Sequence, residues 1–535
     1  MKRYQHIISI ALTVLILSAC NKKIESLQSN PNEPISVTAE LILGAILTDM
    51  SGTQDVGALN GYASWGGVHR WNQYYCRNYE YYGDNQYNWQ DGSFDGYVVL
   101  KNVVQMEKEA LSRGAAAINP YESIGKFVRA YYFYNMTSMM GDIPLDEALQ
   151  GTANLTPAYA TQKEVFQYIL NTLDSANTHL TSLISEKDAT LSNSTQDIYY
   201  GGDLSKWQKL VNTFRLRVLL SLSKQTADAD LNVATQFANI INTPAKYPVF
   251  TSIDDDFQFT YVATYNVYPQ SPNNFGSDAQ RYNMANTYVK SLTDLKDARV
   301  FVTCEPAWNL VTSKGYSTTD FNAFVGASTG ESIAVMYSDA ISGNLSLINR
   351  KRYYSGYTGE PDVLVGYKEM CFNIAEAINR GWISGDAETW YKSGIIASMN
   401  FYGLTTTQTN FTAYFLEFGK SLGDFTSYPF TFDFNAYYAQ TKVKYAGGTD
   451  GLNQILLQKY LTMFQNSGWE AYFNYRRTGI PAFDGGTGIG NSGVIPLRWG
   501  YPSSEQNLNA TNWKSALANQ GFGSDDINGK IWMIK

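Results

Sequence analysis

Apolar side chains recur at helical spacing in several stretches of the chain, and these stretches predict amphipathic helices. Between residues 119 and 140, apolar positions such as Ile124 and Phe127 share one face, and Gly141 and Pro144 then end the helix. The same spacing predicts further helices at 161–180, 205–222, 367–378 and 455–464. Each has a single apolar face and therefore requires a neighbour that buries it.

Two of these predicted helices begin with a capping-box pattern. Thr161 is followed three residues later by Glu164, and Ser205 is followed in the same way by Gln208. In such a box the hydroxyl and the carboxylate or amide satisfy two backbone N–H groups at the helix start. We therefore expect the helices to begin at these residues.

Long segments rich in Tyr, Asn, Gly and Ser separate the predicted helices. They cover residues 57–96, 261–286, 311–359 and 483–512. Loops of this length within a compact body usually serve a function. Antiparallel helix pairs stacked in series would bury all the apolar faces at once, so we expect a mainly α fold with long irregular loops.

The first residues have the pattern of a secretion signal. Lys2 and Arg3 precede an apolar run over 7–17, which is too short to span a bilayer as a helix. Ser18, Ala19 and Cys20 then resemble the lipobox of bacterial lipoproteins. We predict a signal peptide at 1–19, a lipid anchor on Cys20 within a tether at 20–34, and one domain over 35–535. Ordinary secretion is the alternative.

Charge and cysteine content narrow the possible classes. Forty Lys and Arg against 48 Asp and Glu give the 535-residue chain a net charge of −8, so a nucleic-acid partner is not expected. Behind Cys20, the odd number of cysteines (Cys76, Cys304 and Cys371) argues against a disulfide scaffold. We expect small buried hydrophobic residues, with one disulfide and a spare thiol as the alternative.

Catalytic motifs are poorly represented. Behind the predicted signal, the only histidines are His69 and His179, too few for most zinc sites and Ser/His triads. We expect no catalytic residue, no metal and no cofactor, and hence no enzyme. A carboxylate pair for glycoside hydrolysis has no sequence motif, so that alternative stays open.

The segment from Tyr62 to Tyr97 is unusually rich in rings, with 12 aromatic residues among 36. An aromatic face matches the C–H face of a sugar, and neighbouring amides, carboxylates and arginines can bind its hydroxyls. This mixture favours a glycan platform, although the rings could simply pack between loops and helices. The candidate ligand-binding residues are Trp65, Trp71, Tyr74 and Trp89, followed by Tyr282, Trp308 and Arg352; Arg281, Tyr353 and Tyr354 belong to the same secondary cluster.

Five motifs in order give the chain a family resemblance. They are NPNEP at 30–34, MGDIPLDEAL at 140–149, EMCFNIAEAINRGW at 369–382, YRRTGIP at 475–481 and RWGYPSSEQNLN at 498–509. Together with the lipobox they resemble the SusD/RagB family, and within it the second SusD-like subgroup.

The resemblance implies a mainly α fold with tetratricopeptide-like helix pairs. It also implies a lipoprotein on the outer face of the outer membrane that binds an oligosaccharide or polysaccharide without cleaving it. The ligand would then pass to a partner transporter, a SusC-like protein dependent on TonB. The motifs themselves are expected to be architectural, with ligand contacts in variable loops. A peptide ligand is the alternative within the family, and a lipid-anchored all-α glycoside hydrolase is the alternative outside it.

Overall fold

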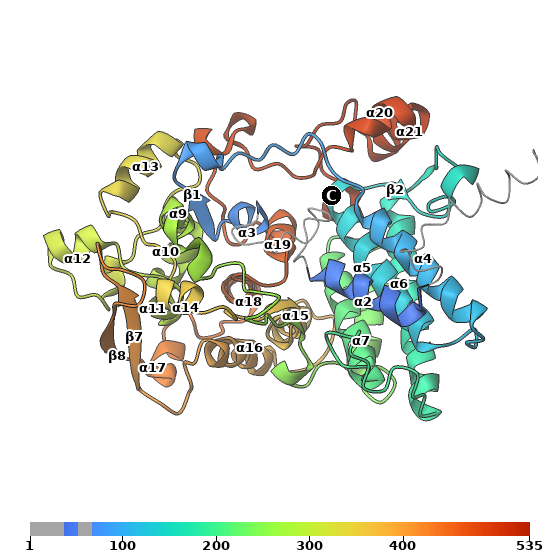
Figure 1. The fold of residues 1–535 in the computed structure, drawn as a ribbon, viewed down its shortest axis with the longest axis horizontal. Helices are drawn as coiled ribbons and strands as arrows, with labels where there is room; N and C mark the ends of the chain where they lie inside the picture. Colours follow the sequence, from blue (N-terminus) through green and yellow to red (C-terminus); the bar gives the residue numbers. More distant parts are fainter. Residues whose placement is uncertain (1–36, 52–66) are drawn as a thin grey trace, which may run out of the picture.

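Long helices form one side of the molecule (blue to green in Figure 1). The structure, a computed structural model, describes residues 37–51 and 67–535. The helices of this side are α2 (Ala39–Met50), α4 (Gly96–Ser112), α5 (Pro120–Met140), α6 (Gln162–Ser185), α7 (Leu204–Ser221) and α8 (Val233–Asn242). From α4 onward each packs against the next, and α2 packs against α4. This arrangement confirms the mainly α fold with tetratricopeptide-like helix pairs.

Local sequence signals fix the starts of these helices. The Asn119 side chain accepts a hydrogen bond at the start of α5, and Thr161 and Glu164 form the expected capping box of α6. The capping box expected at Ser205 is wrong. Asp203 caps α7 instead, because its carboxylate accepts from the backbone N–H groups of Ser205 and Lys206.

A second set of helices packs against this side through buried charges. It comprises α15 (Tyr367–Asn379), α16 (Ala387–Phe401), α18 (Gly448–Thr462) and α19 (Glu470–Thr478). Arg217 of α7 and Glu369 of α15 form an ion pair of 2.5 Å in which both side chains are almost fully buried. Removing one partner of such a pair typically costs about 3–5 kcal/mol, so this contact fixes α15 against α7.

The family motifs contact one another in the core. Glu376 of the third motif pairs with Arg477 of the fourth at 2.5 Å. The Tyr501 hydroxyl of the fifth motif donates to the backbone carbonyl of Asp142 in the second at 2.6 Å. These residues are buried, so the motifs hold distant segments together and do not form a surface.

Within residues 37–51 and 67–535, the strands occur as four two-stranded antiparallel ribbons. Their members are β1 (Tyr75–Arg77) with β5 (Tyr282–Met284), β2 (Ile143–Pro144) with β3 (Tyr159–Ala160), β4 (Phe257–Phe259) with β6 (Asp362–Val365), and β7 (Asn410–Leu416) with β8 (Phe425–Thr431). The last is a hairpin in which Leu416 pairs with Phe425, which leaves residues 417–424 as its tip. Its first strand packs on the short helices α11 and α14.

The segments expected to be irregular contain several short helices. The short helices are α3 (Gly67–Trp71), α9 (Phe275–Arg281), α10 (Asn286–Asp294), α11 (Arg299–Thr303), α12 (Trp308–Lys314), α13 (Ile333–Ile341), α14 (Arg350–Tyr354), α17 (Phe434–Tyr438), α20 (Ser503–Leu508) and α21 (Ala510–Gln520). Of these, α10, α11, α17 and α21 lie wholly or mostly outside the segments expected to be irregular. The segment 311–359 was thus too simply described as a loop, because α13 and α14 lie within it. Among the helices of the described residues, none is long and apolar enough to cross a membrane.

Candidate functional site

Two of the predicted ring residues are buried in the core. Tyr74 is 0% exposed and Trp89 is 2% exposed. Tyr74 stacks on Tyr460 at 4.7 Å, and Trp89 stacks on Trp499 at 3.8 Å. The expectation that these two rings present open faces is wrong, because Tyr460 of α18 and Trp499 of the fifth motif supply aromatic partners that cover them.

The remaining candidates are distributed over different parts of the molecule. Trp65 and Cys20 lie outside the described residues. Trp71 is half-buried and stacks on Trp469 with ring centroids 5.8 Å apart. Tyr282 is 7% exposed, and its hydroxyl accepts from Arg77 at 3.1 Å.

Arg352 lies in a small pocket away from these rings. It forms an ion pair with Glu360, and its guanidinium lies 5.0 Å from the Tyr402 ring centroid. The pocket measures about 310 Å³ and also includes Tyr414 of β7. Because Glu360 already neutralises Arg352, we keep this pocket as a secondary candidate.

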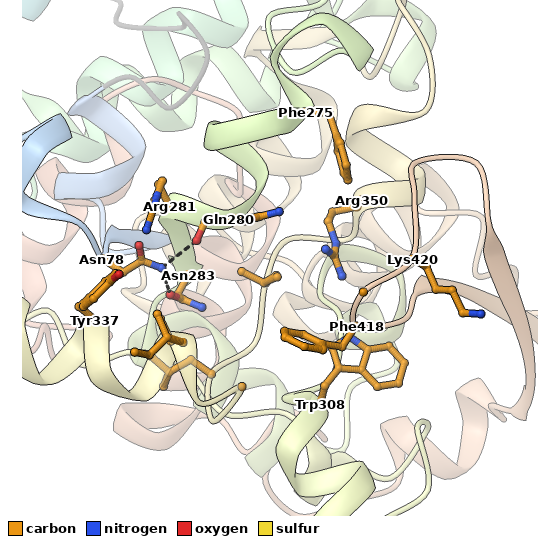
Figure 2. Close-up of a pocket in the computed structure, with 16 residues that line it drawn as sticks. Asn78, Phe275, Gln280, Arg281, Asn283, Trp308, Tyr337, Arg350, Phe418 and Lys420 are labelled. Carbon is orange, nitrogen blue, oxygen red and sulfur yellow. Dashed lines mark hydrogen bonds between the residues drawn. The ribbon is translucent and has the colours of Figure 1, made fainter.

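The last candidate, Trp308, lines a larger pocket of about 510 Å³, which we call the Trp308 pocket. Its other lining residues are Asn78, Phe275, Gln280, Arg281, Asn283, Tyr337, Ala340, Ile341, Gly343, Leu345, Leu347, Arg350, Phe418, Gly419 and Lys420. Figure 2 shows Arg281 and Tyr337 at one side of the pocket and Phe418 and Lys420 at the other. Five separate chain segments therefore meet here.

The rings of the Trp308 pocket differ widely in exposure. The Phe418 side chain, on the tip of the β7–β8 hairpin, is 78% exposed, whereas Trp308 at the start of α12 is 9% exposed. The Trp308 indole N–H is buried without a hydrogen-bond acceptor among the described residues. An exposed ring opposite a buried one provides an apolar surface that a flat ligand can contact.

Amides line the wall of the pocket near Tyr337. The Asn78 side-chain N–H₂ donates to the carbonyl of Gln280 at 3.0 Å and to the Asn283 side-chain oxygen. Asn283 in turn donates to the Ser346 carbonyl at 3.2 Å. These mutual bonds hold the amides in fixed positions beside the rings, where amides suit recognition of hydroxyl groups.

Two arginines border the pocket in different electrostatic states. Arg350 donates to the buried Glu305 carboxylate through Nε at 2.8 Å and Nη2 at 2.6 Å. Burial raises the pKa of Glu305, and the Arg350 charge opposes that rise. The Arg281 guanidinium instead lies 4.0 Å from the Tyr79 ring centroid and 5.9 Å from that of Tyr337. Arg281 has no ion-pair partner within the described part of the chain.

A third pocket is larger but chemically less suited to stacking. It measures about 710 Å³ and lies between α10, α18 and residues 480–484. None of its lining residues is aromatic, and its charges are mixed, with Lys290 and Lys442 beside Asp294, Asp450 and Asp484. Volume alone therefore does not identify the site, and the Trp308 pocket is the stronger candidate.

Metal and thiol chemistry find no support in the described residues. There, no three His, Cys, Asp or Glu side chains gather as a metal site would need. Cys76, Cys304 and Cys371 are free and buried, which confirms the expectation that they act as small hydrophobic residues. Burial lowers the pKa of His69 to about 3, so its imidazole is neutral at pH 7.

Sequence reasoning missed Phe418 and Tyr337. Phe418 follows the end of β7 and precedes Gly419, whose φ of 78° places it in a turn. An isolated large ring next to a glycine turn was the available signal, because a hairpin tip cannot bury such a ring. Tyr337 has no comparable signal, since its position depends on how α13 packs.

The fold and the pocket together define a mainly α-helical protein in which stacked helix pairs support a loop-built, aromatic pocket. The chain belongs to the SusD-like family, because the family model described as starch-binding and associating with the outer membrane matches residues 31–502. This family is associated with the outer membrane and with nutrient uptake.

Solved structures agree with this assignment. A SusD homologue from Bacteroides fragilis has a TM-score of 0.78 at 29% identity, with 93% of this chain and 100% of that chain covered. A second SusD homologue from the same species has a TM-score of 0.73 at 31% identity, with 94% and 100% covered. A chitin-binding SusD homologue from Flavobacterium johnsoniae shares the fold at 20% identity and a TM-score of 0.67, with 92% and 98% covered. No curated protein matches the chain.

Proposed function

We propose that this protein binds an oligosaccharide or polysaccharide in the Trp308 pocket and passes it to a SusC-like, TonB-dependent transporter. A lipid on Cys20 holds the protein at the outer face of the outer membrane, and residues 35–535 act as one binding domain. The protein captures its ligand without cleaving it. Arg352, the half-buried Trp71 and the buried Tyr282 remain secondary candidates for ligand contact.

The observation that carries the proposal is the exposed Phe418 ring in one pocket with Trp308, Tyr337 and fixed amides. Rings bind the C–H faces of sugars and amides bind their hydroxyls. A shallow site of two or three rings has an expected Kd between about 1 μM and 1 mM. Tethering the protein beside a transporter raises the local ligand concentration, so weak binding suffices.

Calorimetry with a ligand panel tests the proposed binding. The panel holds starch, chitin, pectin and glycosaminoglycan oligosaccharides together with pools of peptides, and we expect at least one glycan and no peptide pool to bind. Tyr337→Ala should weaken binding of that glycan about fivefold or more, by analogy with base stacking at about 1–3 kcal/mol per ring. Tyr265→Ala is the matched control, because Tyr265 is 84% exposed and lies outside the pocket.

Each other outcome points to a different function. Binding of peptides alone would support the peptide-uptake alternative. New reducing ends after incubation with the glycans would support the glycoside hydrolase. Equal loss of affinity in the Tyr337 and Tyr265 variants would place the site elsewhere.

The anchor and the partner have separate tests. Cys20→Ala should move the protein from the outer-membrane fraction to the soluble fraction and abolish labelling with a palmitate analogue. Cys76→Ala should leave both unchanged, because Cys76 is a buried free thiol. Purification of the anchored protein in mild detergent should recover a SusC-like protein, and its absence would contradict the proposed delivery.

A further inference from the structure

The lining of the Trp308 pocket is positively charged, whereas the chain as a whole has a negative net charge. Acidic residues outnumber basic ones by 48 to 40 in the sequence. Among the described residues that line the pocket, Arg281, Arg350 and Lys420 are cationic and none is Asp or Glu. The pocket of about 710 Å³ described above is lined instead by charges of both signs. The Arg352 pocket is also lined by cations without Asp or Glu, namely Lys351 and Arg352, but it has one cation fewer than the Trp308 pocket. The lining of the Trp308 pocket therefore differs in charge from the chain as a whole.

Carboxylates that the structure describes form an ion pair with only one of the three cations. Glu305 neutralises Arg350 through two charge-assisted hydrogen bonds. Arg281 and Lys420 take part in no ion pair with any residue that the structure describes. Hydrogen bonds from Tyr428 and Thr426 and the nearby Lys420 charge lower the pKa of Glu417, so Glu417 partly balances Lys420. Arg281 is therefore the pocket cation that no carboxylate of the described residues compensates.

The Arg281 side chain is held in a fixed orientation. Its guanidinium lies over Tyr79 and near Tyr337, and the two rings are themselves 5.3 Å apart. A guanidinium presents paired N–H donors that match the two oxygens of a carboxylate or a sulfate. The Arg281 guanidinium stacks on rings and forms no ion pair with a described carboxylate. Its N–H groups are therefore available to bind an anionic group of the ligand. Figure 2 shows Lys420 across the pocket, on the hairpin.

We infer that the ligand of the Trp308 pocket is an anionic glycan, in which the sugar rings contact Phe418, Trp308 and Tyr337 while carboxylate or sulfate groups pair with Arg281 and Lys420. This inference rests on the proposed glycan binding and specifies its ligand class. A cleft lined by charges of one sign also attracts opposite charges from a distance, so capture should be faster at low salt.

Matched pairs of oligosaccharides test the inference on the unmodified protein. Oligogalacturonate is compared with its carboxyl-reduced form, which is neutral but has the same linkage and ring contacts. Chondroitin sulfate is compared with desulfated chondroitin, which keeps only the carboxylates. We expect calorimetry to show at least tenfold tighter binding for the more highly charged member of at least one pair. The first pair reports recognition of carboxylate and the second reports recognition of sulfate.

Variants locate the recognition within the pocket. The double substitution Arg281→Gln and Lys420→Gln should remove most of the preference for the more highly charged member of the pair. Lys101→Gln on α4 is the matched control, because it removes an exposed charge outside the pocket. Raising NaCl from 50 to 500 mM should weaken the charged ligand in the wild type and have little effect in the double variant.

Failure of this inference differs from failure of the proposed function. If neutral starch or chitin oligosaccharides bind as tightly as the charged ones, or if only they bind, the anionic preference is wrong while glycan binding stands. If no glycan in either set binds, the proposed function itself fails. A charged preference that survives the double substitution would place the anion elsewhere and overturn the inference.

Discussion

Two groups of aromatic side chains in this molecule illustrate different uses of the same residues. The core cluster comprises Trp89, Trp469, Tyr472 and Trp499, and the pocket cluster comprises Phe275, Trp308, Tyr337 and Phe418. Rings of the core cluster contact one another, with Trp89 stacked on Trp499 at 3.8 Å and edge-on to Tyr472 at 4.9 Å. In the pocket cluster, Phe418 is 78% exposed and the rings face amides and cations.

The difference follows from what each group has available to cover it. The core cluster joins Trp89 to rings about 400 residues further along the chain, namely Trp469 and Tyr472 at the start of α19 and Trp499 in the fifth family motif. The pocket cluster lies on short helices and on the tip of a hairpin, and the described residues leave Phe418 78% exposed. In this protein, the stretch of sequence dense in aromatic residues therefore contributes rings to the core, whereas the single ring at the hairpin turn stays exposed and can contact a ligand.

The largest expected effect is on stability and comes from the core cluster. Trp89→Ala should reduce the free energy of unfolding by about 3–5 kcal/mol, because it leaves a cavity among five neighbouring rings. Urea denaturation followed by far-UV circular dichroism measures this change. Glycan affinity per folded molecule should stay the same, and Trp89→Phe should cost less because it keeps part of the packing.

A loss of glycan affinity in folded Trp89→Ala without a loss of stability would contradict this comparison. The core cluster would then belong to the binding surface despite its burial.

A buried carboxyl group near the core should make stability depend on pH. Burial raises the pKa of Asp362 to about 8, and the hydrogen bond from the Tyr261 hydroxyl opposes that rise. The folded state then binds one proton that the unfolded state, with its ordinary carboxyl pKa, has lost. Between about pH 5 and 7 the Asp362 contribution to stability should fall as pH rises, by up to about 1.4 kcal/mol per pH unit.

Asp362→Asn should remove this contribution, because an uncharged amide can still accept from Tyr261. Denaturation of the wild type and the variant at pH 5, 6 and 7 gives the difference in slope. Asp254→Asn is the control, since Asp254 is exposed. Identical slopes for wild type and Asp362→Asn would show that Asp362 is ionised in the folded protein.

Sequence reasoning recovered the helices better than the site. The apolar periodicity of residues 119–140 and the Thr161 capping box are local signals, and both reappear in α5 and α6. The residues next to a side chain in the sequence do not determine whether it is exposed. Tyr74 and Trp89, for example, are covered by residues several hundred positions away. The early aromatic segment was therefore correctly identified as unusual, while its first-choice rings Tyr74 and Trp89 were wrongly expected to be open.

For Trp308 and Arg281, the sequence predicted a part in the site but not the fact that they share a pocket. The sequence marked both residues as secondary candidates because rings and arginines occur near them, and both line the Trp308 pocket. Their common pocket requires α9, α12 and the hairpin tip to meet, which no local pattern encodes. Folding topology, and not residue type, decided which candidates came together.

Substitutions in the pocket cluster should weaken glycan binding and leave stability unchanged, which is the opposite of what we expect for the core cluster. Phe418→Ala should weaken glycan binding by about 1–3 kcal/mol, because it removes an exposed stacking face. It should change the free energy of unfolding by no more than about 0.5 kcal/mol, since little of the ring is buried. Calorimetry and urea denaturation of the same preparation measure the two quantities. A large loss of stability would show that the hairpin tip supports the fold.

The smallest expected effect is that of Tyr414→Ala. This variant tests whether the ligand occupies the Trp308 pocket or the Arg352 pocket. Tyr414 lies on β7 of the same hairpin and is 45% exposed, but it lines the smaller pocket with Arg352 and not the Trp308 pocket. Substitution should leave glycan affinity within about twofold and stability within about 0.5 kcal/mol of the wild type. If instead Tyr414→Ala weakens binding and Phe418→Ala does not, then the ligand occupies the Arg352 pocket. The contrast between covered and open rings would still hold, but the open ring that binds would be on the strand of the hairpin and not at its tip.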